Sequence, residues 1–221
     1  MLKIVGLACL LILFRLFGVD VEEKVTTKKV PMPVASRCES GISARCVNTS
    51  DGILIAWDDK DEALSYDIYR SPDDPDDDWE YYDTVIAPKD KFIDTDATSG
   101  VLQEYRICGC YEDGSMVVSN KAIHIWVPPV ESLAFQSVEN GVQISWDAID
   151  GASGYRVYRT LDKQLLPVGF LDGDTTMYLD EDATEDGQTY GYAVSAVMSW
   201  DHRDFFSDYN VEYMIYGDYA S

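Results

Sequence analysis

Five aspartates crowd into the stretch 71–80, SPDDPDDDWE, and clustered carboxylates are the ligands that calcium prefers. They are Asp73, Asp74, Asp76, Asp77 and Asp78. The stretch also holds two prolines and lacks the spacing of an EF-hand loop, which favours a solvated acidic loop. We therefore expect no resident cofactor, with calcium at these aspartates as the alternative.

Four cysteines lie in the first half of the chain, after the N-terminal apolar segment, and none follows residue 110. They are Cys38, Cys46, Cys108 and Cys110, and their spacings C-x7-C and C-x-C do not fit a four-thiolate zinc site. In an exported protein an even number of cysteines favours disulfides. Cys108 and Cys110 have the same strand parity, so a bond between them would be strained. We predict that each pairs with the 38–46 segment; the alternatives are two unpaired thiols, or one bridge and one intermolecular contact.

The chain offers little for catalysis. Its two histidines, His124 and His202, share no local motif, and there is no G-x-S-x-G, H-E-x-x-H or Gly-rich phosphate loop. The chain has 40 acidic and 17 basic side chains, so pairs of carboxylates are expected by composition alone and do not indicate a catalytic site. We expect a protein that is not an enzyme.

The net charge of −23 excludes nucleic-acid binding, because phosphate contacts need a basic surface, and it excludes a basic patch on anionic lipid. Partners of basic character, or a salt-rich or calcium-rich setting, remain open. At the N-terminus, residues 1–19 combine Lys3 with an apolar run over 4–14, which predicts a signal peptide or short membrane anchor. Residues 20–37 read as a polar stalk. We expect a secreted or cell-surface protein, with Asn48 in a glycosylation sequon.

Two stretches of the chain, 52–71 and 141–160, have similar sequences and form an internal repeat. Trp57 and Trp146 stand 89 residues apart, and so do Tyr66 and Tyr155. In both copies apolar residues alternate with polar ones ahead of the tryptophan, as they do in a strand with one buried face. Short alternating runs bounded by Gly, Asp, Asn and Pro continue throughout, which predicts an all-β fold.

These motifs resemble the fibronectin type III domain, in the sequence form that is found in bacterial secreted and surface proteins. The matching residues are Ile53, Ile55, Trp57, Tyr66, Ile68, Tyr69 and Tyr105 in the first copy, and Val142, Ile144, Trp146, Tyr155, Val157, Tyr158 and Tyr192 in the second. The resemblance implies two tandem seven-strand fibronectin type III-like β-sandwiches after the hydrophobic leader, at 36–127 and 128–218. An immunoglobulin domain would instead need a cysteine on the second strand.

The resemblance also implies that the loop 199–208, between the last two strands, is a recognition loop. Its candidate contact residues are Trp200, His202, Arg203, Phe205 and Phe206; the alternative is that they pack over the end of the sandwich. The leading hypothesis is a non-catalytic binding and spacer protein for a protein or glycan at the cell surface. Three alternatives stay open: a self-assembling filament or surface-layer subunit, an accessory module of a polysaccharide-degrading system, and a cytokine-receptor-like ectodomain.

Overall fold

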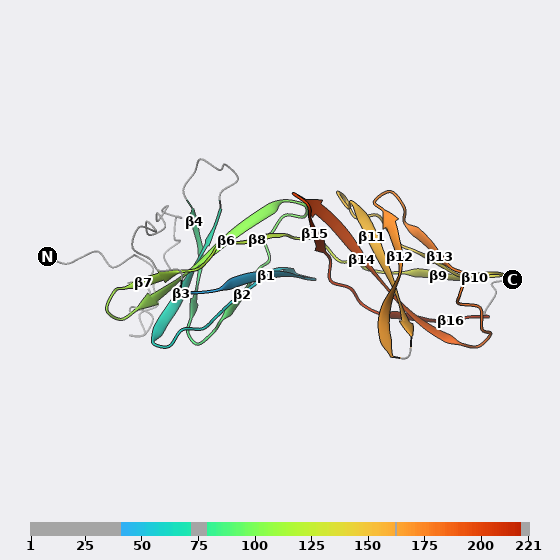
Figure 1. The fold of residues 1–221 in the computed structure, drawn as a ribbon, viewed down its shortest axis with the longest axis horizontal. Helices are drawn as coiled ribbons and strands as arrows, with labels where there is room; N and C mark the ends of the chain where they lie inside the picture. Colours follow the sequence, from blue (N-terminus) through green and yellow to red (C-terminus); the bar gives the residue numbers. More distant parts are fainter. Residues whose placement is uncertain (1–40, 72–78, 162, 218–221) are drawn as a thin grey trace, which may run out of the picture. The chain divides into compact units, whose positions relative to one another are not determined.

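The computed structural model describes residues 41–71, 79–161 and 163–217 (Figure 1). The predicted leader, the stalk, Cys38 and the five clustered aspartates lie outside these residues. The described part of the chain contains strands and turns, which confirms the all-β prediction. It holds no helix that is long and apolar enough to cross a membrane.

The first sandwich is built from two antiparallel sheets. One has the order β1-β2-β5, and the other has the order β4-β3-β6-β7 with β8 also paired to β6. The strands are β1 (Ala44–Thr49), β2 (Gly52–Trp57), β3 (Ala63–Arg70), β4 (Glu80–Ile86), β5 (Lys91–Asp94), β6 (Leu102–Tyr111), β7 (Met116–Val118) and β8 (Ala122–Ile125).

The second sandwich repeats this plan. Its sheets have the orders β13-β10-β9 and β12-β11-β14-β15, with β16 also paired to β14. The strands are β9 (Ala134–Val138), β10 (Gly141–Ser145), β11 (Gly154–Leu161), β12 (Gln164–Asp172), β13 (Met177–Asp180), β14 (Thr189–Trp200), β15 (Arg203–Phe206) and β16 (Glu212–Ile215).

Each sandwich has eight described strands instead of the predicted seven, because the last strand is divided in two. In each sandwich a serine lies at the division. Its hydroxyl accepts a hydrogen bond from a backbone amide of the neighbouring strand, in place of a backbone carbonyl. Ser119 accepts from the Ile107 amide at 2.9 Å, and Ser207 accepts from the Ala196 amide at 3.0 Å. Counted as one interrupted strand, each pair restores the predicted seven.

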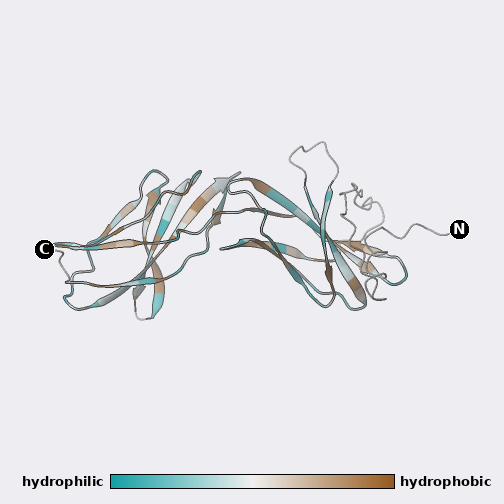
Figure 2. Ribbon diagram, turned by 180° about the vertical axis from the view of Figure 1, so that it is seen from behind, coloured by the Kyte–Doolittle hydropathy of each residue, from teal (hydrophilic) through white to brown (hydrophobic). Residues whose placement is uncertain are grey.

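The repeated aromatic residues fill the interiors, as the sequence predicts. Trp57 is 2% exposed and Trp146 is 6% exposed. Each indole packs at 5.3 Å, ring centre to ring centre, on the tyrosine of the next strand, Tyr66 or Tyr155. Figure 2 shows the corresponding alternation of hydrophobic and hydrophilic residues along the strands.

The chain divides into two compact units. The first contains the described residues up to Val47, together with Leu54–Asp94 and Gln103–His124. The second contains Asn48–Ile53, Thr95–Leu102 and everything from Ile125.

Candidate binding surface

The larger sheet of the second sandwich has one face in the core and one face turned outward. Along β11, Tyr155 and Val157 are buried in the core, so Arg156, Tyr158 and Thr160 belong to the outer face. The alternation along β11 therefore places Arg156 and Tyr158 next to each other on the face of the sheet that is turned away from the core.

Arg156 is held between two phenyl rings on this outer face. Its guanidinium carbon lies 4.7 Å from the ring centre of Phe170, which is its cross-strand partner on β12, and 4.5 Å from that of Phe206 on β15. No ion pair of Arg156 occurs within the described part of the chain, and its Nε has no hydrogen-bond partner there. The two cation–π contacts therefore hold the guanidinium in place on the outer face, with its Nε buried and unpaired within the described residues.

A shallow hollow of about 220 Å³ lies beside Arg156. Hydroxyls and a carboxylate border it: Ser153 Oγ lies 3.0 Å from Ser199 Oγ, and Ser199 Oγ donates to Asp204 Oδ1 at 2.7 Å. The hollow thus combines hydrogen-bond donors and acceptors with the aromatic side chains Phe170 and Phe206.

Further aromatic rings lie on the same face of the sheet, from Arg156 towards the C-terminal end of β11. Tyr158 stacks on Tyr209 with ring centres 5.3 Å apart and planes tilted by 28°. Further along, Tyr213 of β16 is paired with Gly191 of β14. A Cβ atom at Gly191 would lie only 2.7 Å from the Tyr213 ring and from Thr160 Oγ1, so glycine lets this ring lie against the sheet.

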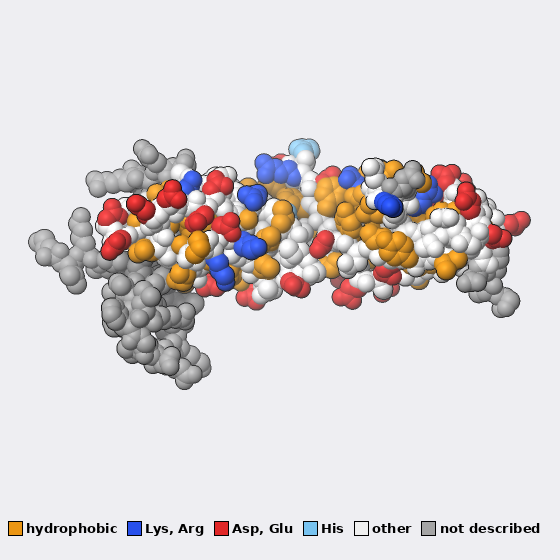
Figure 3. All heavy atoms as spheres, turned by 90° about the horizontal axis from the view of Figure 1, so that it is seen from below, with side chains coloured by type: hydrophobic (Ala, Val, Ile, Leu, Met, Phe, Trp, Pro, Cys, Tyr) orange, Lys and Arg blue, Asp and Glu red, His pale blue; other side chains and the backbone are white. Residues whose placement is uncertain are grey.

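We call this surface the aromatic track; it comprises Arg156, Tyr158, Phe170, Phe206, Tyr209 and Tyr213. Phe170 is 68% exposed, Tyr213 65% and Tyr209 40%. Figure 3 shows that hydrophobic side chains reach the surface in patches among the acidic ones. Of these six residues the sequence analysis singled out only Phe206 as a site residue, because the others come from four separate strands and loops.

The predicted recognition loop is a tight hairpin between β14 and β15. Asp201 and His202 form its turn with φ values of 46° and 61°, and Trp200 and Arg203 flank it, all four exposed. Phe205 instead belongs to the core of the second sandwich. The alternative of local packing therefore holds for Phe205, while Phe206 faces the aromatic track.

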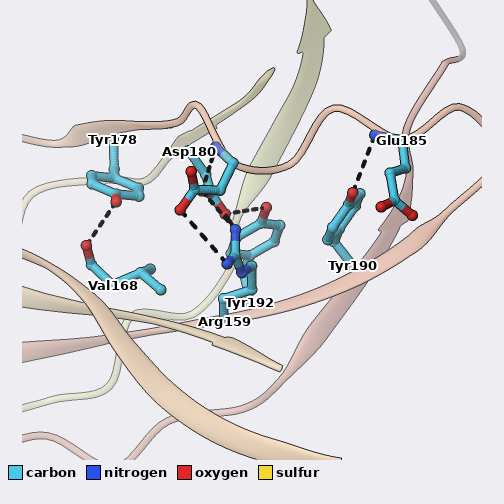
Figure 4. A network of polar contacts seen from close by, with 8 residues as sticks. Arg159, Val168, Tyr178, Asp180, Glu185, Tyr190 and Tyr192 are labelled. Carbon is cyan, nitrogen blue, oxygen red and sulfur yellow. Dashed lines mark hydrogen bonds and ion pairs between the residues drawn. The ribbon is translucent and has the colours of Figure 1, made fainter. Parts of the chain in front are cut away.

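A second polar cluster is buried inside the second sandwich (Figure 4). Arg159 Nη1 donates to both carboxylate oxygens of Asp180 at 2.8 and 2.7 Å, and the Tyr192 hydroxyl donates to Oδ2 at 2.9 Å. Carboxylate, guanidinium and phenol together could suggest acid–base chemistry. Asp180 is only 2% exposed, however, so the group is closed to a substrate and acts in the core.

The first sandwich contains the same arrangement around Asp94. Tyr105 and Tyr82 each donate to its carboxylate at 2.6 Å, and Arg70 Nη1 donates at 3.1 Å. Burial opposes ionisation of Asp94, but the two tyrosine hydrogen bonds and the Arg70 charge outweigh it, so the pKa of Asp94 is lowered. Recurrence in both copies identifies this network as part of the scaffold.

The outer face of the larger sheet in the first sandwich is closed. Tyr69, Cys108 and Val118 are each 4% exposed or less, and they form a small apolar cluster with the half-buried Trp79, Tyr81 and Met116. Beside them Asp67 is 6% exposed; it accepts hydrogen bonds from Thr84 Oγ1 at 2.7 Å and from Cys110 Sγ at 3.5 Å. Burial raises the pKa of Asp67, and these two bonds offset part of the rise.

The predicted pairing of Cys46 with Cys108 or Cys110 is wrong. Cys46 and Cys108 are free thiols, and no disulfide joins the three described cysteines. Cys46 lies on β1, whereas Cys108 and Cys110 lie on β6 in the other sheet and face outward, as their parity predicted. Facing sheets stand about 10 Å apart, well beyond the reach of a disulfide. Burial raises the pKa of the Cys46 thiol to about 12.

Asn48 and the histidines take ordinary structural places. Asn48 is half-buried, with Nδ2 donating to the Ile125 carbonyl and Oδ1 accepting from the Val127 amide, so its amide is already engaged. Burial lowers the pKa of His124 to about 4, whereas His202 is exposed in its hairpin turn. No group of three or more His, Cys, Asp or Glu residues suited to a metal occurs within 41–71, 79–161 and 163–217.

No family model and no curated protein matches the chain. Among solved structures, a two-domain fibronectin type III segment of chicken tenascin aligns over 78% of this chain and 97% of its own, with 13% identity and a TM-score of 0.39. The FN1–FN3 domains of chicken CNTN1 align over 86% of this chain and 69% of theirs, with 13% identity and a TM-score of 0.40.

Pectate lyases also align, over a smaller part. For pectate lyase PelI of Erwinia chrysanthemi, in complex with tetragalacturonic acid, the alignment covers 37% of this chain and 27% of the lyase, with 25% identity and a TM-score of 0.34. The aligned part thus spans about a quarter of that enzyme's length. The fibronectin type III-like architecture of the chain rests on its own strand order, given above.

Proposed function

We propose that this chain is a non-catalytic binding and spacer protein of the cell exterior. Its two sandwiches serve as the scaffold, and the aromatic track of the second sandwich is the contact surface. The observation that carries the proposal is Arg156, stacked between Phe170 and Phe206 on an open sheet face.

The aromatic track is hard to explain as a contribution to stability. A phenylalanine that stays 68% exposed adds little to the core, since hydrophobic stabilisation scales with the area removed from water. Contiguous exposed apolar groups mark interaction sites, and arginine with aromatic residues is enriched where partners bind. The clamp also fixes Arg156 in advance, which lowers the entropy lost on binding.

The partner that fits this proposal is a protein or a glycan at the cell surface. The acidic composition, with a net charge of −23, favours partners that are basic or uncharged over polyanions. The predicted leader at residues 1–19 would supply export or attachment to the membrane.

The proposal is tested by presenting the full chain to arrays of extracellular proteins and of glycans. We expect at least one ligand whose signal falls at least tenfold in Phe170→Ala and in Arg156→Ala. Met177→Ala is the matched control, because Met177 is 52% exposed on β13 of the opposite sheet. Ligands that are retained equally by all variants, or no ligand at all, would contradict the proposal.

A further inference from the structure

We infer that the aromatic track binds an uncharged polysaccharide chain, an inference that rests on the binding function proposed above. A pyranose ring has an apolar C–H face and a rim of hydroxyls. The track offers both complements on one surface: exposed tyrosine rings for the faces, and a cluster of donors and acceptors for the rim.

The tyrosines provide the stacking platforms. Tyr158 and Tyr209 support each other as a stacked pair, and Tyr213 lies against the sheet over Gly191. Tyrosine carries a rigid apolar body with a polar tip and loses little conformational entropy when it is covered. These rings are therefore suited to a ligand that is apolar on its face and polar at its edge.

The length of the track favours a polymer over a single sugar. Arg156 and Thr160 are four residues apart on β11, which corresponds to about 13 Å at the usual rise of a strand. Rings lie at both ends of this distance, with Phe170 and Phe206 beside Arg156 and Tyr213 beside Thr160. A chain of repeating rings can contact all of them at once.

The polar groups near Arg156 match hydroxyls. Arg156 lines the hollow and stacks on Phe170 and Phe206, so its guanidinium, a planar group of N–H donors, is held at the hollow by the two rings. Asp204 and Ser199, which are hydrogen-bonded to each other at 2.7 Å, supply acceptors in the same hollow. One cation and one carboxylate make the site close to neutral.

Electrostatics decides between charged and uncharged chains. A polyanion would approach a molecule of net charge −23, in which the charge of Arg156 in the hollow is offset by that of Asp204. The same repulsion acts between two copies of this chain. An uncharged polysaccharide meets no such barrier, and its hydroxyls use both the donor and the acceptor.

The test is native gel electrophoresis of the full chain through gels that contain barley β-glucan, xylan, galactomannan or hydroxyethyl cellulose, with polygalacturonate as the anionic arm. We expect retardation in at least one uncharged polysaccharide. Tyr213→Ala and Phe170→Ala, both at exposed positions, should weaken it at least tenfold, and Met177→Ala should leave it unchanged. Gly191→Ala, which displaces Tyr213, should weaken it in the same way.

Other outcomes overturn the inference. Retardation by polygalacturonate alone would show that the ligand is anionic, and no retardation would exclude polysaccharides of both kinds. Concentration-dependent dimers that Phe170→Asp abolishes in sedimentation would show that the track binds a second copy. If the gels fail but a protein on the array still depends on Phe170, the ligand class is wrong while the binding function stands. If both fail, so does the binding function.

Discussion

The outer faces of the two larger sheets differ although they are built on the same scaffold. Asp67 and Arg156 occupy equivalent positions, 89 residues apart, and so do Tyr69 and Tyr158. In the first sandwich these residues are closed in, and Asp67 bonds to Thr84 and Cys110. In the second sandwich Arg156 stacks between exposed rings. The fold constrains the inner face of each sheet and leaves the outer face able to diverge.

The inner faces are more alike: in both sandwiches an arginine and a tyrosine donate to the buried aspartate, while the residues around this pair differ. In the first sandwich the hydroxyl of Tyr82 bonds to Asp94, and Phe92 packs against the edge of its ring. In the second sandwich Val168 takes the place of Tyr82 in the bulge, and Tyr178, the counterpart of Phe92, donates to the Val168 carbonyl. Tyr178 thus bonds to a carbonyl and not to the carboxylate, and Asp180 instead accepts two bonds from Arg159 and one from the Asp182 amide at 3.3 Å, so each buried carboxylate is satisfied by a different set of donors.

The largest effect should come from removing the shared carboxylate. Asp94→Ala and Asp180→Ala should each lower the free energy of unfolding by about 3–5 kcal/mol, because a half-buried arginine and a buried tyrosine lose their shared partner. Calorimetry of each variant, with hydrogen exchange to assign the loss to a sandwich, checks this. A cost below about 1 kcal/mol for one of them would break the equivalence of the two networks.

The next test compares Tyr69 with Tyr158. Tyr69→Ala should cost about 3 kcal/mol, since the ring is 3% exposed and packs edge-on against Tyr81 at 6.1 Å. Tyr158→Ala should cost about 1 kcal/mol, because the half-buried ring contacts one stacked neighbour and water. Urea unfolding of both variants measures the difference, and equal costs would show that the second outer face is as closed as the first.

The third test uses the raised pKa of Asp67. The folded state holds the Asp67 proton more tightly than the unfolded state, whose carboxyl titrates near 3.8. Ionised Asp67 therefore lowers stability above that pH range. Asp67→Asn should stabilise the protein by about 1 kcal/mol at neutral pH, and the gain should vanish near pH 3.

Asp94 should show the opposite dependence of stability on pH, because its pKa shifts in the opposite direction. Its pKa is lowered in the folded state, so it stabilises the fold above the ordinary carboxyl range and loses that contribution as the pH falls. Thermal unfolding of the wild type and of Asp67→Asn between pH 3 and pH 7 follows both effects. A gain for Asp67→Asn that is the same at all pH values would contradict the assignment.

The smallest effect on stability should come from Phe170. Phe170→Ala should change the free energy of unfolding by no more than about 0.5 kcal/mol, because the side chain is mostly exposed. Its counterpart in register is Thr84, opposite Asp67, and Thr84→Ala should cost about 1 kcal/mol by removing a hydrogen bond from a buried carboxylate. Equal costs for the two variants would mean that Phe170 is structural.

Much of the scaffold could be predicted from the sequence, and much of the site could not. The buried positions of Trp57 and Trp146 and the outward direction of Cys108 follow from period-two alternation within single strands. The predicted pairing of Cys46 with Cys108 or Cys110 failed because it needed the distance between two sheets. The aromatic track was missed because Phe170 and Phe206 are far from Arg156 in the chain, and only strand pairing brings them together.

By itself the sequence determined that the chain contains two copies of one sandwich, because the same motif occurs twice. It also determined which side chains turn inward, because each strand carries that information in its own alternation of apolar and polar residues. Only the tertiary structure decided which outward side chains meet, and which of the two outer faces stays open to solvent. That outcome depends on register across strands and on what packs over each sheet, and neither is encoded locally in any one strand.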